Sequence, residues 1–143
     1  MKKQEEMMQP AISGKRFEVG FHVLNQWLCL RQNGKTLLPF FEDNLIENIA
    51  IYGMGALGER LYCELKGSKV LVKYGIDRMA ASKAGTELKL YHSDESNIPD
   101  SDAIVVTPVQ DYWEIVRILE RKTGAAIVSL ADVIDYCIDR ERG

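Results

Sequence analysis

The chain has 143 residues, of which 46% are hydrophobic, and a formal net charge of −3 at pH 7, which is typical of one soluble domain. Its lysines and arginines are scattered along the chain, which argues against nucleic acid or an anionic membrane surface as the main partner. No apolar run approaches the roughly 20 residues that a membrane helix needs, and the first residues lead into no signal-peptide core, so we expect a cytoplasmic protein without membrane insertion.

Residues 1–16 are charged and lack apolar periodicity, so we expect a frayed or disordered N-terminus. We expect residues 17–47 to form a helical extension. An amphipathic helix is predicted over residues 17–31, and Asn33 and Gly34 stop it. A second short helix is predicted over residues 36–42, with Thr36 as its cap. The apolar residues of the extension that must be buried somewhere are Phe17, Phe21, Leu24, Trp27, Leu28, Phe40 and Phe41.

The sequence Gly34-Lys35-Thr36 resembles the end of a phosphate-binding P-loop. That motif needs a glycine where Cys29 stands, and a strand where a helix is predicted. An ordinary turn between two helices is therefore the better interpretation.

An apolar run begins at Asn48, breaks into glycines and resumes with helical periodicity, which predicts a strand, a tight turn and a helix. Gly53 would allow the sharp turn, Gly55 would leave room for a phosphate, and Gly58 would let the helix pack close to the strand. A second β-rich run over residues 70–77 ends in Asp77. Together these features are the dinucleotide-binding fingerprint.

Further strands are predicted at residues 87–91, 102–108 and 125–129, with helices over 112–122 and, after a cap at Asp132, over 133–142. Strands that alternate with helices indicate an α/β fold. We expect residues 48–143 to form a doubly wound, mainly parallel, five-stranded Rossmann-like sheet, preceded by the N-terminal helical extension.

Such a fold binds ligands at the carboxyl ends of its strands, where the strand order reverses. Backbone N–H groups and the dipole at the start of the first helix would favour a pyrophosphate there. The predicted cofactor-binding residues are Gly53, Met54, Gly55, Ala56, Leu57, Gly58, Asp77, Arg78, Thr107 and Pro108.

Asp77 could bind an adenosine ribose and repel a 2′-phosphate, which favours NAD over NADP, whereas Arg78 could accommodate that phosphate. Two alternatives stay open. Asp77 and Arg78 could form a solvated turn, and Thr107 and Pro108 could be a strand end followed by a helix start.

No self-contained catalytic set is visible, so the catalytic residues are unknown and it stays open whether the chain is an enzyme. His22 and His92 are poor candidates for a base or a metal ligand. Tyr62 and Lys66 match the Tyr-x-x-x-Lys pair of short-chain dehydrogenases, but they lie on the helix that should hold the phosphate. The acidic loop over residues 92–102 lacks the pattern of a calcium loop, and no metal is expected.

The three cysteines, Cys29, Cys63 and Cys137, lie within apolar patterns and form no C-x-x-C pair. Their number is odd, so a complete set of disulfides is excluded and a zinc site is not indicated. We expect reduced, buried thiols.

The chain from Trp27 through residues 34–37 and 48–55, followed by residues 74–77 and 102–108, resembles the small Rossmann-like domains of bacterial capsular-polysaccharide and glycan-biosynthesis proteins. Residues 48–108 are also similar to the N-terminal domain of sugar-modifying NAD(P)-dependent oxidoreductases. Those enzymes carry a catalytic lysine and histidine in a second domain, which we expect this chain to lack. The resemblance implies a nucleotide-binding fold in a sugar context.

We therefore expect a module that binds a small-molecule nucleotide in bacterial surface-glycan synthesis, with NAD(H) as the first ligand and a nucleotide-sugar as the next. One alternative is an oxidoreductase half-domain completed by a partner chain. Another is a ligand-free interaction module with the same fold. The apolar extension also predicts a homodimer through the N-terminal helices.

Overall fold

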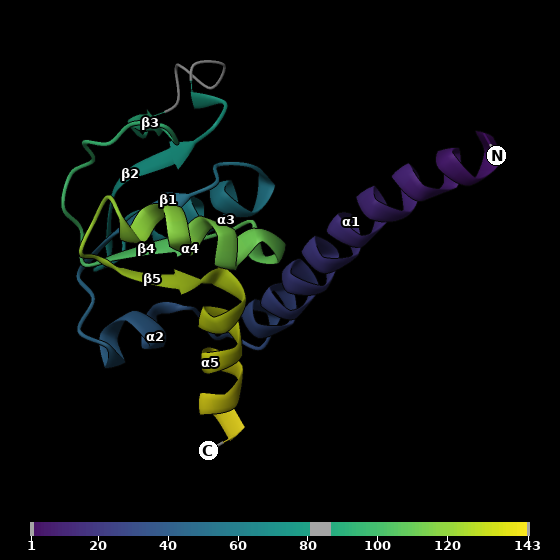
Figure 1. The fold of residues 1–143 in the computed structure, drawn as a ribbon. Helices are drawn as coiled ribbons and strands as arrows, with labels where there is room; N and C mark the ends of the chain where they lie inside the picture. Colours follow the sequence, from purple (N-terminus) through teal and green to yellow (C-terminus); the bar gives the residue numbers. More distant parts are fainter. Residues whose placement is uncertain (1, 81–86, 143) are drawn as a thin grey trace.

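The computed structural model of the chain describes residues 2–80 and 87–142. Five parallel strands form one sheet in the order β3-β2-β1-β4-β5 (Figure 1). The strands are β1 (Asn48–Tyr52), β2 (Leu71–Asp77), β3 (Leu90–His92), β4 (Ala103–Val106) and β5 (Ala126–Ser129). The predicted α/β fold with a parallel, five-stranded Rossmann-like sheet is confirmed.

Strand β1 lies in the centre of the sheet and pairs with β2 on one side and β4 on the other. Helix α3 (Ala56–Leu65) leads from β1 to β2, and helix α4 (Tyr112–Glu120) leads from β4 to β5. The chain thus winds outward in both directions from β1. The strand order reverses between β1 and β4, which is the place where open α/β sheets bind ligands.

The central strands are covered on both faces, which explains their continuous apolar sequences. On one face, Ile49, Ile51 and Val105 pack against the helices other than α4. On the other face, Ala50, Ile104 and Val106 pack against α4 through Ile115 and Leu119. Burial of a side chain of the size of leucine or isoleucine contributes about 1.5–3 kcal/mol, so these two layers supply the core of the domain.

Helix α5 (Leu130–Arg142) follows β5 directly and begins three residues before the predicted start at 133. Asp132 therefore lies within the first turn of α5, and its predicted role as the N-cap is wrong. The hydroxyl of Ser129 takes that place, because its Oγ accepts a hydrogen bond from the Ala131 N–H at 3.2 Å. The strand ends in a residue that can itself cap the helix, so no loop is needed between the two elements.

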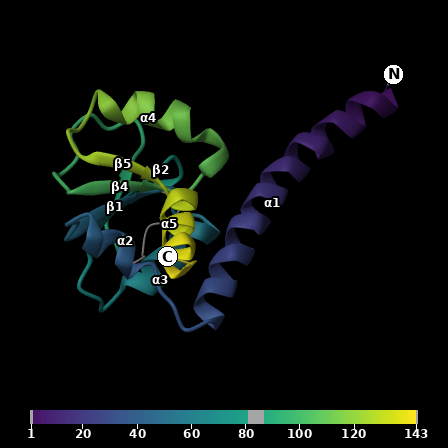
Figure 2. The same cartoon turned by 90° about the horizontal axis from the view of Figure 1, so that it is seen from below.

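Helix α1 (Lys2–Gln32) is the longest element, and helix α2 (Leu38–Asp43) follows it. The N-terminal half of α1 projects away from the sheet and its helices, whereas the C-terminal half packs near α5 (Figures 1 and 2). α1 includes residues 2–16, for which the sequence analysis expects fraying or disorder, and fraying in solution stays a prediction. Among the described residues, no helix is both long enough and apolar enough to cross a membrane.

The apolar residues of α1 form two stripes rather than the one apolar face of the predicted amphipathic helix. Val23, Trp27 and Leu30 are buried against the domain. The outward stripe lies about a third of a turn away, so it cannot meet the domain at the same time. Its members and their exposed fractions are Phe17 (79%), Phe21 (72%), Leu24 (41%) and Leu28 (54%).

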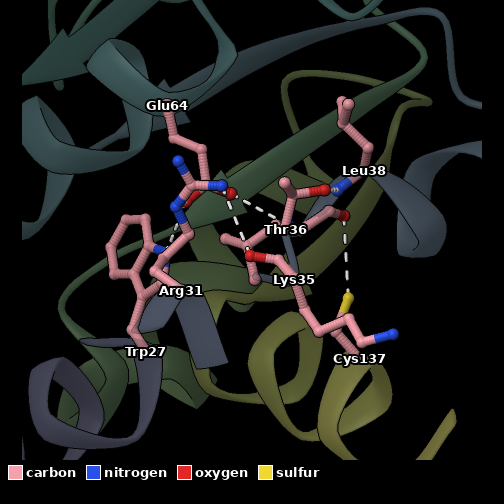
Figure 3. A network of polar contacts seen from close by, with 8 residues as sticks. Trp27, Arg31, Lys35, Thr36, Leu38, Glu64 and Cys137 are labelled. Atoms are coloured by element: carbon pink, nitrogen blue, oxygen red, sulfur yellow. Dashed lines mark hydrogen bonds and ion pairs between the residues drawn. The ribbon is translucent and has the colours of Figure 1, made fainter. Parts of the chain in front are cut away.

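A carboxylate on α3 anchors the C-terminal half of α1 (Figure 3). The Glu64 side chain is only 7% exposed. Its Oε1 accepts a hydrogen bond from Trp27 Nε1 at 2.8 Å and lies 3.4 Å from Arg31 Nε, and its Oε2 accepts one from the Leu37 N–H at 2.9 Å. Glu64 therefore joins α1, the connection to α2 and α3.

Helix α2 is held at both of its ends. Thr36 Oγ1 accepts a hydrogen bond from the Leu38 N–H at 3.2 Å, but the N-cap residue is Leu37 and α2 has no side-chain cap, so the predicted role of Thr36 as the cap is wrong. At the other end, the Asp43 carboxylate accepts hydrogen bonds from Tyr136 at 2.7 Å and Arg140 at 2.9 Å, both on α5. These bonds lower the pKa of Asp43 below its ordinary value, the Tyr136 hydroxyl being the largest cause.

The prediction of three buried thiols is correct only for Cys137. Cys137 is buried and its Sγ lies 3.7 Å from the Leu37 carbonyl oxygen, whereas Cys29 and Cys63 are exposed. Cys29 and Cys63 are sequence neighbours of apolar helix residues, but they lie on the solvent side of α1 and α3. All three are free thiols.

We predict that Glu64→Ala lowers the free energy of unfolding by about 3 kcal/mol, because it leaves Trp27 Nε1 and the Leu37 N–H without their acceptor. The measurement is urea denaturation of the purified protein. The matched control is Glu59→Ala, which removes an exposed carboxylate from the first turn of the same helix and should cost less than about 1 kcal/mol. Equal losses for the two variants would contradict the anchoring role of Glu64.

Candidate functional site

A cavity of about 340 Å³ lies at the carboxyl ends of the central strands. We call it the crevice. The predicted site residues that line it are Gly53, Gly55, Ala56, Leu57, Asp77, Arg78, Thr107 and Pro108. The predicted residues Met54 and Gly58 do not line it. Lining residues outside the predicted set of site residues are Arg16, Gly20, Tyr52, Met79 and Gln110.

Gly53 makes the sharp turn at the end of β1, with a φ of +91° that favours glycine. A Cβ atom at this position would stand 2.6 Å from Thr107 Oγ1 and 2.7 Å from Pro108 Cδ. Thr107 stabilises this turn, because its hydroxyl lies 3.1 Å from the Tyr52 carbonyl oxygen and 2.7 Å from the Gly53 carbonyl oxygen. The glycine loop, residues 53–58, is therefore held directly on the end of β4.

Gly58 and Gly55 have opposite surroundings. A Cβ atom at Gly58 would stand 2.0 Å from the Gly53 carbonyl oxygen, so α3 approaches the turn more closely than any other residue type would allow. A Cβ atom at Gly55 would meet nothing within 4 Å. The backbone at Gly55 thus faces open space, whereas Gly58 is required by packing, which agrees with the structural roles predicted for the two glycines.

Helix α3 begins directly at the crevice. Gly55 is its N-cap residue and has no side chain to bond the first N–H groups, and Ala56 and Leu57 of the first turn line the cavity. The first N–H groups of a helix have no intrahelical acceptor, and the helix dipole places partial positive charge there. The start of α3 is therefore suited to an anionic group such as a phosphate.

Asp77 is 8% exposed and binds the glycine loop, so it is not the solvated turn residue of the alternative interpretation. Its Oδ2 accepts a hydrogen bond from the Met54 N–H, and its Oδ1 accepts one from the Met79 N–H, both at 2.7 Å. The carboxylate therefore joins the end of β2 to the loop after β1. Asp77 also lines the crevice, and its binding to a ribose stays a prediction.

Polar groups from three further elements surround the crevice. Arg78 follows β2, Gln110 belongs to helix η2 (Val109–Asp111) after β4, and Tyr52 ends β1. Burial raises the pKa of Tyr52 above its ordinary value, so its hydroxyl is protonated at neutral pH. The crevice therefore combines uncharged hydrogen-bonding groups with a guanidinium.

The remaining wall comes from α1, through Arg16 and Gly20. Arg16 Nη1 lies 3.2 Å from Asp111 Oδ2, so an ion pair links α1 to η2 beside the crevice. Residue 16 falls within the N-terminal segment that was predicted to be frayed or disordered, and no role was predicted for either residue. The signal in the sequence is their spacing, because residues four apart lie on the same side of a helix.

The other groups considered for catalysis lie away from the crevice lining. Tyr62 and Lys66 both contact Glu87, and the three residues line a separate cavity beside α3. His22 is exposed, and the His92 ring accepts a hydrogen bond from the Asp94 N–H at 3.0 Å. Within residues 2–80 and 87–142, no three His, Cys, Asp or Glu side chains are grouped as metal ligands.

We predict that Gly58→Ala lowers the free energy of unfolding by about 2 kcal/mol or more, because the new methyl group collides with the Gly53 carbonyl and α3 must move. Gly55→Ala is the matched control and should cost less than about 1 kcal/mol, since its Cβ enters open space. Thermal and urea denaturation measure both effects. A Gly58→Ala protein as stable as the Gly55→Ala protein would contradict the close packing of α3 on the glycine loop.

Comparisons of the chain with protein-family models, with curated proteins and with solved structures find no match. The function of the chain must therefore be argued from the crevice itself, because a fold of this kind serves many functions.

Proposed function

We propose that the protein is a nucleotide-binding module whose crevice holds a pyrophosphate-containing nucleotide. The observation that carries this proposal is the open backbone at Gly55, which lies at the start of α3 and next to the cavity. At this position a phosphate can approach the backbone without meeting a side chain. The close packing at Gly58 supports the same interpretation, because it sets the direction in which the start of α3 points.

NAD(H) is the first ligand class of the proposal, and a nucleotide-sugar is the second. The pyrophosphate would accept hydrogen bonds from the N–H groups at the start of α3. Asp77, at the end of β2, would face the ribose, and Arg78 beside it would decide how well a 2′-phosphate is accepted. The end of β4, at Thr107 and Pro108, would border the second half of the ligand.

We further propose that the module works in bacterial surface-glycan synthesis in the cytoplasm and that it is not a complete enzyme by itself. The resemblance of residues 48–108 to sugar-modifying oxidoreductases supports this context. No nucleophile or base among the residues of the crevice completes a catalytic set. If the module takes part in hydride transfer, the catalytic groups come from a partner chain.

We predict that NAD⁺, NADH or a nucleotide-sugar raises the melting temperature of the protein. At a ligand concentration of about one hundred times Kd, the stabilisation is about 2.7 kcal/mol, which a thermal-shift assay detects. Gly55→Ala should weaken binding about tenfold or more, because its methyl group takes the space of the phosphate. Gly124→Ala is the matched control, since its Cβ also enters open space but lies outside the crevice.

The proposal fails if no nucleotide at millimolar concentration changes the melting temperature. It also fails if Gly55→Ala and Gly124→Ala bind the same ligand as tightly as the wild-type protein does. The first result would favour the ligand-free interaction module.

A second proposal concerns the partner of α1, namely a second copy of this chain. The outward stripe of Phe17, Phe21, Leu24 and Leu28 has successive spacings of four, three and four residues. These are the spacings of positions a and d in a coiled coil. Two copies of one stripe form a self-complementary interface about a two-fold axis, and the two phenylalanines supply the aromatic residues in which interface cores are enriched.

We predict that the wild-type protein is a dimer at micromolar concentration and that the double variant Phe17→Ser, Phe21→Ser is a folded monomer. Both phenylalanines are exposed in the single chain, so their replacement should leave the domain stable. Light scattering measures the mass in solution. Trp113→Ser is the matched control, because Trp113 is 74% exposed on α4 and its loss should leave the dimer intact. A monomeric wild-type protein would contradict the proposal.

A further inference from the structure

Helix α1 contributes a cation to a crevice that the Rossmann-like unit does not complete alone. Arg16 and Gly20, one helical turn apart, line the same cavity as the glycine loop. The Arg16 side chain is 55% exposed, and its Nη1 lies 3.2 Å from Oδ2 of Asp111, whose side chain is 31% exposed. The ion pair links two separate elements, α1 and η2, and it leaves Arg16 accessible to solvent and to a ligand.

The charges around the crevice favour an anion with more than one charge. Three positive groups line the crevice: the start of α3, Arg78 after β2 and Arg16 on α1. Of the two carboxylates nearby, Asp77 accepts hydrogen bonds from the glycine loop, and Asp111 contacts Arg16 and offsets part of its positive charge. A single phosphate at the start of α3 would leave the positive group on α1 without an anionic partner in the ligand.

The shape of the arginine side chain allows Arg16 to bind Asp111 and a phosphate at the same time. A guanidinium carries five N–H donors in a rigid plane, and the contact with Asp111 is made through one of its nitrogens, Nη1. The remaining donors can bind phosphate oxygens while Asp111 keeps the group in place. Asp111 is thus the positioning residue for Arg16.

Gly20 supports the same interpretation. Glycine is less favourable than alanine within a helix, so Gly20 is a weak position in α1. A Cβ atom at Gly20 would meet no protein atom within 4 Å, and Gly20 lines the cavity. The missing side chain keeps the wall of the crevice flat beside Arg16.

We propose that Arg16 of α1 binds the second phosphate of a nucleoside diphosphate moiety whose first phosphate lies at the start of α3. This inference rests on the proposed nucleotide-binding function and names the part of the ligand that the site recognises. ADP, NAD(H) and nucleotide-sugars all contain this moiety. The diphosphate is therefore the group that Arg16 and the start of α3 recognise in each of them. A phosphate that competes with Asp111 for Arg16 loses little, because a solvent-exposed ion pair such as Arg16–Asp111 contributes little to stability.

The test is calorimetric titration of the full chain with ADP and UDP, and with the monophosphates AMP and UMP. The wild-type protein should bind at least one diphosphate about tenfold or more tightly than the monophosphate of the same base, because hydrogen bonds to charged groups are strong. Arg16→Gln should remove this preference and leave the affinity for the monophosphate unchanged. Titrations with NAD⁺ and UDP-glucose then show which of these larger ligands also binds more weakly to Arg16→Gln than to the wild-type protein.

Lys15→Gln is the matched control, since it removes the same charge from the neighbouring exposed residue, which does not line the crevice. It should bind every ligand as the wild-type protein does. If Arg16→Gln and Lys15→Gln both bind the diphosphate with wild-type affinity, the role of Arg16 is overturned while the proposed function stands. If the wild-type protein binds none of the nucleotides, the proposed function fails and this inference fails with it.

Discussion

The contact between Gly58 and the carbonyl oxygen of Gly53 is the constraint on which the site depends. No side chain fits between the start of α3 and the turn after β1, so the helix lies directly against the loop. Thr107 and Asp77 hold that loop from the two neighbouring strands. The start of α3, with its open backbone at Gly55, is therefore presented to the crevice in one orientation, which is the preorganisation that an anion site requires.

Helix α1 connects this constraint to the remainder of the chain. Glu64 on α3 binds Trp27 and the connection after α1, while Arg16 of α1 contacts η2 beside the crevice. One long helix thus carries a buried stripe against the domain, an arginine at the crevice and an exposed apolar stripe. The proposed ligand binding and self-association involve the same two turns of α1, because Arg16 and Gly20 are the direct sequence neighbours of Phe17 and Phe21.

The order of strands and helices was predictable because each element has a local signal. The continuous apolar runs of β1 and β4 and the glycines at 53, 55 and 58 are read from neighbouring residues alone. The errors concern contacts between distant residues. The cap at Ser129, the exposure of Cys29 and Cys63, and the division of α1 into two stripes depend on which side of each helix meets the sheet. Arg16 was missed for the same reason, since Asp111 lies 95 residues away in the sequence.

The central claim is that the start of α3 binds the phosphates of a nucleotide. An amide NMR titration with ADP tests it most directly, because it reports on each backbone N–H group. The account predicts that the largest shifts occur at Gly55, Ala56 and Leu57, together with a shift of the Arg16 side-chain N–H. Shifts confined to the separate cavity near Tyr62 and Lys66, or no shifts at millimolar ADP, would contradict it.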